Sequence, residues 1–214
     1  MFRFGLAVIC FIGGGLAYDG WDGIQAVSAD GFKCLANNGY SFFVARVWHS
    51  YGGFDETGIQ NIKNARAAGW KDVDGYIFPC VRSTCDDAGT QVRNVVNQLN
   101  AEGAQFGMLW LDIEIWEWGT DMTWNQNFIT ALGNELDALK INWGIYTSRN
   151  NWQSIVGVDW SVWSSKPLWW ATYDGKKDYS DFKAFGGWNK VAIHQWAGSV
   201  NGPCGVNMDL NYYP

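Results

Sequence analysis

Asp112 and Glu114 interrupt a long apolar stretch of the chain, residues 108–118, which reads MLWLDIEIWEW and has a third acid, Glu117, near its end. Asp112 and Glu114 are two positions apart, so in a β-strand their side chains point to the same face. Two carboxyl groups in apolar surroundings can have well-separated pKa values, which suits one group to act as an acid and the other as a base. The stretch therefore predicts a strand that carries acid/base chemistry. The alternative is a strand that ends here and leaves both acids solvated in a loop.

The elements around this stretch alternate between strands and helices. After about four such β-α units the chain continues mostly as strands, so we predict an α/β fold with parallel strands inside and helices outside. Seven or eight strands favour closure, and the expected architecture is a single-domain, irregular, TIM-like (β/α) barrel whose helices are reduced in the C-terminal third. The expected strands are 18–22, 42–48, 73–78, 105–115, 143–147, 167–173, 191–196 and 207–211. The expected helices are 29–38, 55–68, 87–102, 123–140 and a turn at 151–156.

Active sites of parallel barrels lie at the carboxyl ends of the strands. In a closed barrel the first and last strands are neighbours, so Asp22 and Asp209 are expected to face Asp112 and Glu114 across the mouth. Asp22 and Asp209 each have an alternative interpretation, since Asp22 could cap the following helix and Asp209 could be a solvated acid near the C-terminus. Asp19 competes with Asp22 for the same role.

Aromatic and amide side chains near the expected strand ends are candidates for binding substrate. The chain has fifteen tryptophans, and flat rings suit stacking on sugar faces, although core packing is the alternative for most of them. An acidic mouth with aromatic rings at its rim is what hydrolysis of a glycosidic bond requires. The candidates are Tyr146, Trp169, Trp170, Tyr173, Gln195 and Trp196.

The charge and the remaining motifs exclude other functions. A formal net charge of -6 argues against capture of nucleic acid or of an anionic membrane, because both need a basic surface. The only histidines, His49 and His194, are far apart and lie in no cluster with ligand spacing, so we predict neither a metal nor a cofactor. No GxSxG motif and no phosphate-binding loop supports another catalytic class.

The N-terminal residues and the cysteines indicate secretion. Residues 1–17 have a basic start, a short apolar run and small residues before Tyr18, which is typical of a signal peptide. The mature domain would then span residues 18–214 and retain four cysteines, which allow three disulfide pairings. We expect Cys80–Cys85 and Cys34–Cys204, and a zinc site is the weaker alternative.

Several motifs, taken in order, resemble the glycoside hydrolase family 25 lysozymes. The closest likeness is to the short, cysteine-containing lysozymes of invertebrates and protists, and it covers essentially all of the mature chain. Single motifs are weak, but their order and spacing are fairly specific. They are LDIE at 111–114, GIYTS at 144–148, PLWWATY at 167–173, HQW at 194–196 and MDLN at 208–211.

This resemblance implies hydrolysis of the β-1,4 bond between N-acetylmuramic acid and N-acetylglucosamine in peptidoglycan. It assigns Glu114 as the proton donor and Asp112 as the group that orients or stabilises the substrate's acetamide. It also matches Asp22 to the family's N-terminal strand Asp, Asp209 to its C-terminal strand Asp, and Tyr146 to its barrel-mouth tyrosine. The first strand departs from the family pattern, because GWDGIQAVS stands at 20–28 where a GxDVS-like segment is usual. We expect a secreted or lysosome-like, digestive location and a monomer.

Two alternatives remain open at this point. A family 18 chitinase also has a barrel and a DxE, but its DxxDxDxE motif would need acids at Gly107 and Trp110. A secreted sugar-binding protein without catalysis would use the same aromatic rings. The stereochemical route, whether retaining, inverting or assisted by the substrate's acetamide, depends on side-chain distances. Because the protein and peptidoglycan are both anionic, we expect an acidic pH optimum.

Overall fold

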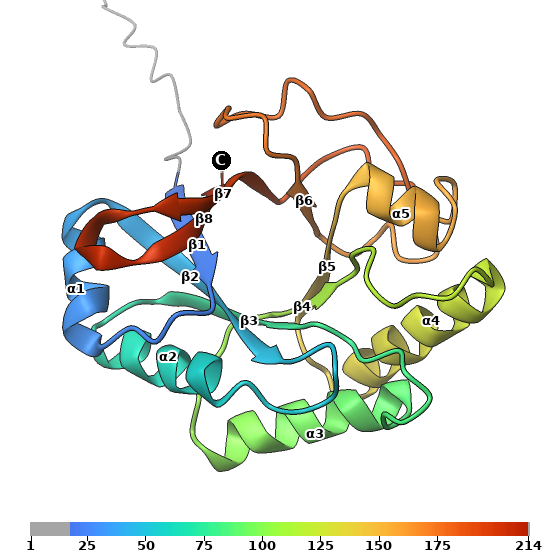
Figure 1. Ribbon diagram of the computed structural model, residues 1–214, viewed down its shortest axis with the longest axis horizontal. Helices are drawn as coiled ribbons and strands as arrows, with labels where there is room; N and C mark the ends of the chain where they lie inside the picture. The colour runs from blue at the N-terminus through green and yellow to red at the C-terminus, as the bar shows by residue number, and fades with distance from the viewer. Residues whose placement is uncertain (1–17, 214) are drawn as a thin grey trace, which may run out of the picture.

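The computed structural model describes residues 18–213, and the predicted signal peptide and Pro214 lie outside the described residues. Within them, eight strands close into a barrel in chain order (Figure 1). The strands are β1 (Tyr18–Gly23), β2 (Tyr40–Trp48), β3 (Asp72–Ile77), β4 (Leu109–Asp112), β5 (Trp143–Thr147), β6 (Leu168–Ala171), β7 (Ile193–Asn201) and β8 (Asn207–Tyr213). The helices are α1 (Ala29–Asn37), α2 (Glu56–Ala67), α3 (Ala88–Ala101), α4 (Met122–Ala138) and α5 (Arg149–Ile155).

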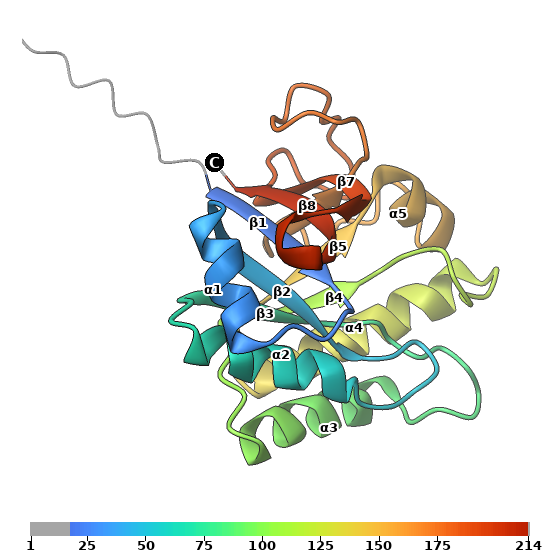
Figure 2. The same cartoon turned by 60° about the vertical axis from the view of Figure 1, so that its left-hand side comes forward.

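The predicted α/β barrel is confirmed, including the loss of helices near its end. Strands β1 to β7 run parallel, each beside the next, and α1 to α4 cover the outside of the first half (Figure 2). The chain then follows an irregular path over residues 172–192 between β6 and β7. Each of the five helices begins at a side-chain cap that accepts a backbone N–H, which satisfies part of its first turn. These caps are Ser28, Asp55, Asp87, Asp121 and Ser148.

The last strand reverses direction. Strand β8 pairs antiparallel with both β7 and β1, so it closes the barrel between them. The physical reason is the short connection from β7 through the 3-10 turn Pro203–Gly205, because a parallel partner needs a crossover of about a dozen residues. The same hairpin extends β7 well beyond the predicted 191–196.

Two apolar layers hold the barrel. One lies between the strands and the helices and includes Leu109 and Leu111, and the other fills the interior and includes Trp110. Thus the predicted alternation in β4 is confirmed, with Asp112 continuing the inward face. The predicted length of this strand, 105–115, is wrong: β4 ends at Asp112, and Glu114 lies in the loop that follows.

Disulfides join Cys34 to Cys204 and Cys80 to Cys85, as predicted. The first links α1 to the turn between β7 and β8, two parts of the chain that are 170 residues apart. Among residues 18–213, no helix is both long and apolar enough to cross a membrane.

Candidate active site

Four carboxyl groups meet at the carboxyl end of the parallel strands. Asp22 in β1 is the register partner of Asp209 in β8. Asp112 is the last residue of β4, and Glu114 follows two positions later. The charges of Asp209 and Glu114 both raise the pKa of Asp22, and the charge of Glu114 raises that of Asp112. The four groups therefore form one electrostatic unit, which we call the acid cluster.

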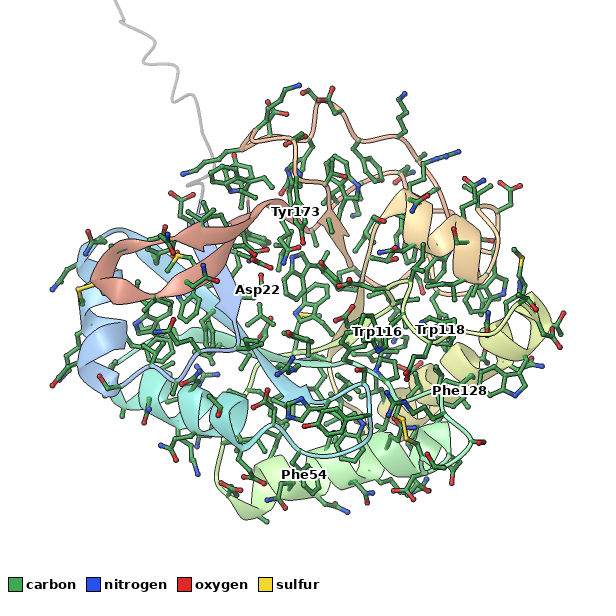
Figure 3. All side chains as sticks on the ribbon, viewed as in Figure 1. Asp22, Phe54, Trp116, Trp118, Phe128 and Tyr173 are labelled. Atoms are coloured by element: carbon green, nitrogen blue, oxygen red, sulfur yellow. A yellow bond between two sulfur atoms is a disulfide. The ribbon has the colours of Figure 1, made fainter. Side chains whose placement is uncertain are left out.

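The antiparallel direction of β8 explains the position of Asp209. This residue is the third in β8, near the start of the strand. The start of an antiparallel strand lies level with the carboxyl ends of its parallel neighbours, so Asp209 reaches the same end of the barrel as Asp112. Figure 3 shows Asp22 inside the ring of strands, with Tyr173 at the edge above it.

Burial is the main cause of the pKa shifts in the acid cluster. It raises the pKa of Asp22 from 3.8 to about 8, and the neighbouring Asp209 adds to the shift. It raises the pKa of Asp112 well above its usual value, and those of Glu114 and Asp209 above theirs. Carboxyl groups in apolar surroundings resist ionisation, and close acids cannot all be charged together. The acid cluster consequently retains protons at pH values where exposed carboxyl groups have lost theirs.

A chain of oriented hydrogen bonds fixes Asp22. Its Oδ1 accepts from Gln195 Nε2 at 2.7 Å and from Asn211 Nδ2 at 2.7 Å. Gln195 Oε1 in turn accepts from the hydroxyls of Tyr146 at 2.7 Å and Tyr173 at 3.0 Å. Both amides are thereby held in one orientation, so the network positions Asp22 and the two tyrosines together.

Asp112 and Glu114 form the second half of the acid cluster. Their carboxyl groups lie close enough for each to shift the pKa of the other, and the hydroxyl of Tyr146 lowers the pKa of Glu114. Asp112 Oδ1 is buried and has no hydrogen-bond partner among the described residues. A buried acceptor of this kind costs free energy unless a ligand satisfies it. It marks a position where a donor group of a substrate would be stabilised.

Comparison with known proteins identifies the family. The family model described as Lysozyme-like protein 1 matches residues 16–196. Lysozyme-like protein 5 of Caenorhabditis elegans is 48% identical to this chain, and probable GH family 25 lysozyme 2 of Dictyostelium discoideum is 37% identical; each alignment covers 92% of both chains. The chain belongs to the family 25 lysozymes. The resemblance found in the sequence is thus confirmed, and membership makes the protein a glycoside hydrolase of the muramidase type.

A solved structure supports the fold independently. The family GH25 lysozyme from Aspergillus fumigatus superposes with a TM-score of 0.71 at 19% sequence identity, over 93% of this chain and 94% of that one. At this level of identity the likeness concerns the fold. The fold is therefore shared with a family 25 lysozyme of distant sequence.

Not every aromatic candidate lies at the mouth of this family 25 barrel. Trp169 points inward but is only 1% exposed, and its Nε1 donates to Asn211 Oδ1 at 2.7 Å, so it supports the hydrogen-bond network from below. The prediction that Trp170 lines the mouth is wrong, because its ring is buried on the outer side of the barrel and stacks on His194 at 4.3 Å. Trp196 is partly buried, and Lys177 Nζ lies 5.5 Å from its ring centroid.

Tyr146 and Tyr173 both lie beside the acid cluster, with different exposure. Tyr146 is buried beside Glu114, whereas Tyr173 is 62% exposed and keeps its hydroxyl on Gln195. Asp19 and Asp22, which compete for one role in the sequence, lie in different surroundings. Asp19 pairs with Lys177 at 2.8 Å near the surface, and Asp22 joins the acid cluster.

Three further residues contribute to the site and were not predicted. Asn211 holds Asp22, and the charge of Arg46 lowers the pKa of Asp112. Tyr76 is partly buried near Asp22 and Asp112, whose charges add to the effect of burial and raise its pKa further. Strand alternation could have found Asn211, which is two positions after Asp209. Within residues 18–213, no group of three or more His, Cys, Asp or Glu side chains is arranged to hold a metal ion.

Proposed function

We propose that the protein is a secreted lysozyme that hydrolyses the β-1,4 bond between N-acetylmuramic acid and N-acetylglucosamine in bacterial peptidoglycan, acting as a monomer. Family membership supports the class of reaction. The observation that carries the residue assignment is the buried, unpartnered Asp112 Oδ1 beside Glu114, a carboxyl group whose burial raises its pKa. The predicted signal peptide supports a secreted or lysosome-like, digestive location.

Glu114 has the properties of the general acid. A proton donor must hold its proton until the leaving oxygen needs it, so its pKa must be raised towards the working pH. Burial raises the pKa of Glu114, while the neighbouring Asp112 and Tyr146 limit the shift. Its place in the loop after β4 leaves it nearer the mouth than Asp112. The proton of Glu114 passes to the glycosidic oxygen as the bond to the anomeric carbon breaks.

Asp112 has the properties of a partner for the substrate's acetamide. An N-acetyl sugar carries an amide N–H, which can donate to the free Oδ1 of Asp112. This contact would turn the acetamide oxygen towards the anomeric carbon, where it forms a bond as the leaving group departs, and water later opens that ring. The adjacent placement of Asp112 and Glu114 favours this substrate-assisted route over an attack from across the site. Asp22 and Asp209 share protons, and the member of the pair that is ionised would stabilise the positive charge that develops on the sugar.

The deciding experiment compares Glu114→Gln with a matched control. Clearing of bacterial cell walls is expected to fall about 100- to 10,000-fold in Glu114→Gln. Glu117→Gln is the control, because Glu117 is exposed, lies three residues away and pairs with Arg82 Nη2 at 2.7 Å outside the acid cluster. New muramic acid reducing ends should appear with the wild type and with the control. Equal clearing by Glu114→Gln would refute the assignment of the acid.

The same assay separates the alternatives. A chitinase would release sugar from glycol chitin and leave cell walls turbid. A sugar-binding protein without catalysis would sediment with peptidoglycan and release no new reducing ends. Either result would overturn the proposed function, whereas cleavage of peptidoglycan alone supports it.

A further inference from the structure

His194 lies directly beside the active site but on the opposite face of β7. Its ring is fully buried and stacks on Trp170 at 4.3 Å. The next residue, Gln195, points into the barrel and holds Asp22 and Tyr173. A change at His194 therefore acts within one residue of the hydrogen-bond network of the acid cluster.

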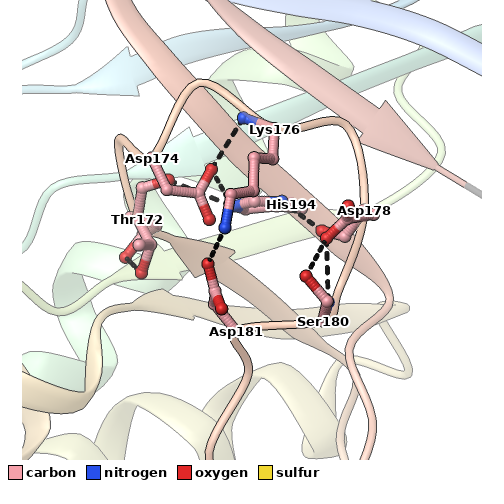
Figure 4. A network of polar contacts seen from close by, with 8 residues as sticks. Thr172, Asp174, Lys176, Asp178, Ser180, Asp181 and His194 are labelled. Carbon is pink, nitrogen blue, oxygen red and sulfur yellow. Dashed lines mark hydrogen bonds and ion pairs between the residues drawn. The ribbon is translucent and has the colours of Figure 1, made fainter.

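Both ring nitrogens of His194 face carbonyl oxygens. Nδ1 lies 2.7 Å from the carbonyl oxygen of Asp178, and Nε2 lies 3.0 Å from that of Thr172 (Figure 4). A neutral imidazole has a single N–H and can donate to only one of these acceptors. The other nitrogen would then turn a lone pair towards a carbonyl oxygen. Only the doubly protonated ring donates to both.

The surroundings of the ring provide a counter-charge. Asp174 Oδ1 lies 3.9 Å from Nε2, and Asp174 Oδ2 is buried without a hydrogen-bond partner among the described residues. A buried carboxylate and a buried imidazolium each need an opposite charge nearby. Lys176 is not free to act as the counter-charge of Asp174, since its ammonium group pairs with Asp181. The other titratable groups around the ring are Asp178 and Tyr179 from the same segment and Tyr212, its register partner in β8.

The two carbonyl groups belong to a segment that is itself neither helix nor strand. Residues 172–192 connect β6 to β7 without regular structure. Two backbone hydrogen bonds tie the start of this segment to β7, from Thr172 N to Gln195 O at 3.0 Å and from Gly175 N to Trp196 O at 3.1 Å. The ring holds the segment at two points, Thr172 and Asp178. Thr172 precedes Tyr173, whose hydroxyl donates to Gln195 at the mouth. By holding Thr172, the ring thus helps to determine where the next residue, Tyr173, lies.

We propose that doubly protonated His194 is a positioning residue that fastens the segment 172–178 to β7 and thereby holds Tyr173 at the active site. Loss of one ring proton removes one donor and sets a lone pair against a carbonyl oxygen, which loosens the segment where the backbone hydrogen bonds at Thr172 and Gly175 do not hold it. The effect on catalysis rests on the proposed function. The charge state of the ring and the fastening of the segment do not.

The charge state can be measured directly. The chain has two histidines, so a ¹⁵N-histidine NMR spectrum contains two rings, and His49→Gln assigns them. At pH 5, both nitrogens of His194 are expected to show the shifts of protonated nitrogens, and amides of residues 172–178 should exchange slowly with deuterium. Their exchange should accelerate in step with loss of the second ring proton as pH rises. A single-tautomer neutral ring at pH 5 in the folded protein would overturn the proposal.

Activity gives the second readout. In His194→Gln, kcat/KM on cell walls is expected to fall about 10- to 100-fold, because a misplacement of about 1 Å can cost about 100-fold. In the wild type, activity should decline with rising pH over the same range in which the NMR signal of the His194 ring changes. This decline should be absent in His194→Gln and present in His49→Gln. An unchanged decline in His194→Gln would refute the positioning role. If no form clears cell walls, the proposed function fails, and the NMR and exchange measurements still decide the charge and the fastening.

Discussion

The two ends of the barrel each contain carboxyl groups against aromatic rings, buried at the carboxyl end and partly buried at the amino end, but the hydrogen bonds of these groups differ. At the amino end, Asp74 is fully bonded: its Oδ1 accepts from Met108 N at 2.9 Å and its Oδ2 from Trp110 Nε1 at 3.0 Å. At the carboxyl end, Asp112 keeps one buried oxygen without a partner among residues 18–213. The amino end also has a cavity of about 590 Å³, which includes Asp74, Phe42, Trp110 and Tyr213 in its lining.

A raised pKa alone does not separate these two ends. Burial is the main cause that raises the pKa of both Asp74 and Asp112. Neither does the presence of a cavity, since the amino end has one. The difference lies in the hydrogen bonds. Both carboxyl oxygens of Asp74 accept hydrogen bonds from the protein, whereas Oδ1 of Asp112 accepts none from the described residues. An incomplete set of hydrogen bonds, together with like charges nearby, is thus the better sign of chemistry.

The largest expected effect of this difference is on activity. Asp112→Asn keeps the shape of the side chain but removes its charge and one acceptor, so kcat on peptidoglycan should fall about 100- to 1,000-fold, as for the loss of one preorganised electrostatic group. The free energy of unfolding should stay within about 1 kcal/mol of wild type or rise, since repulsion from Glu114 is relieved. Wall clearing and urea unfolding measure the two quantities. A loss of stability with normal kcat would place Asp112 in the same class as Asp74.

The converse change tests the other end. Asp74→Asn presents an N–H group to one of two donors, Met108 N or Trp110 Nε1, and so leaves a buried clash. We expect the free energy of unfolding to fall by about 1–3 kcal/mol and kcat to remain near the wild-type value. Urea unfolding and the same assay measure both. A large drop in kcat without a loss of stability would show that the amino end communicates with the active site.

A third prediction concerns pH. The folded state raises the pKa of Asp22 from 3.8 to about 8, so it binds this proton more tightly than the unfolded chain does. The associated stability is fully present below pH 3.8 and is lost as pH rises through about 8. Asp22→Asn keeps an oxygen for Gln195 and Asn211 but cannot ionise. Between pH 4.5 and 8, its free energy of unfolding should fall by about 1–2 kcal/mol less than that of wild type, because the cluster shares protons and only part of the shift belongs to Asp22. Parallel slopes in urea unfolding would contradict the shift.

The sequence predicted the inward acids well, for reasons that the structure makes plain. Alternation in β4 placed Asp112 inside, and closure of the barrel placed Asp22 beside Asp209. Both inferences depend only on periodicity and on the order of strands. They hold although β4 is shorter than expected and β8 runs in the opposite direction.

The prediction was poorer where it depended on the exact phase of a strand or on chain direction. Trp169 and Trp170 are adjacent, so only one of them can point inward, and the sequence does not say which. Arg46 escaped notice, although it is two residues from inward-facing Val44 in β2. The shared hydrogen bonds of Gln195 depend on side chains from β1, β5 and the loop after β6. No local pattern contains such a contact, because it arises only when the barrel closes.

The smallest expected effect compares exposed rings at the two ends. Trp116, which is 63% exposed in the loop after Glu114, can stack on a sugar beyond the cleaved bond, whereas Tyr213, 45% exposed, lies at the amino end. Trp116→Ala should raise KM on polymeric peptidoglycan about 2- to 10-fold, the equivalent of one aromatic contact, with kcat unchanged, because this contact is equal in the bound and transition states. Tyr213→Ala should change neither constant. An equal rise in KM for both variants would mean that the glycan contacts both ends of the barrel, and the contrast between a catalytic end and a structural end would then fail.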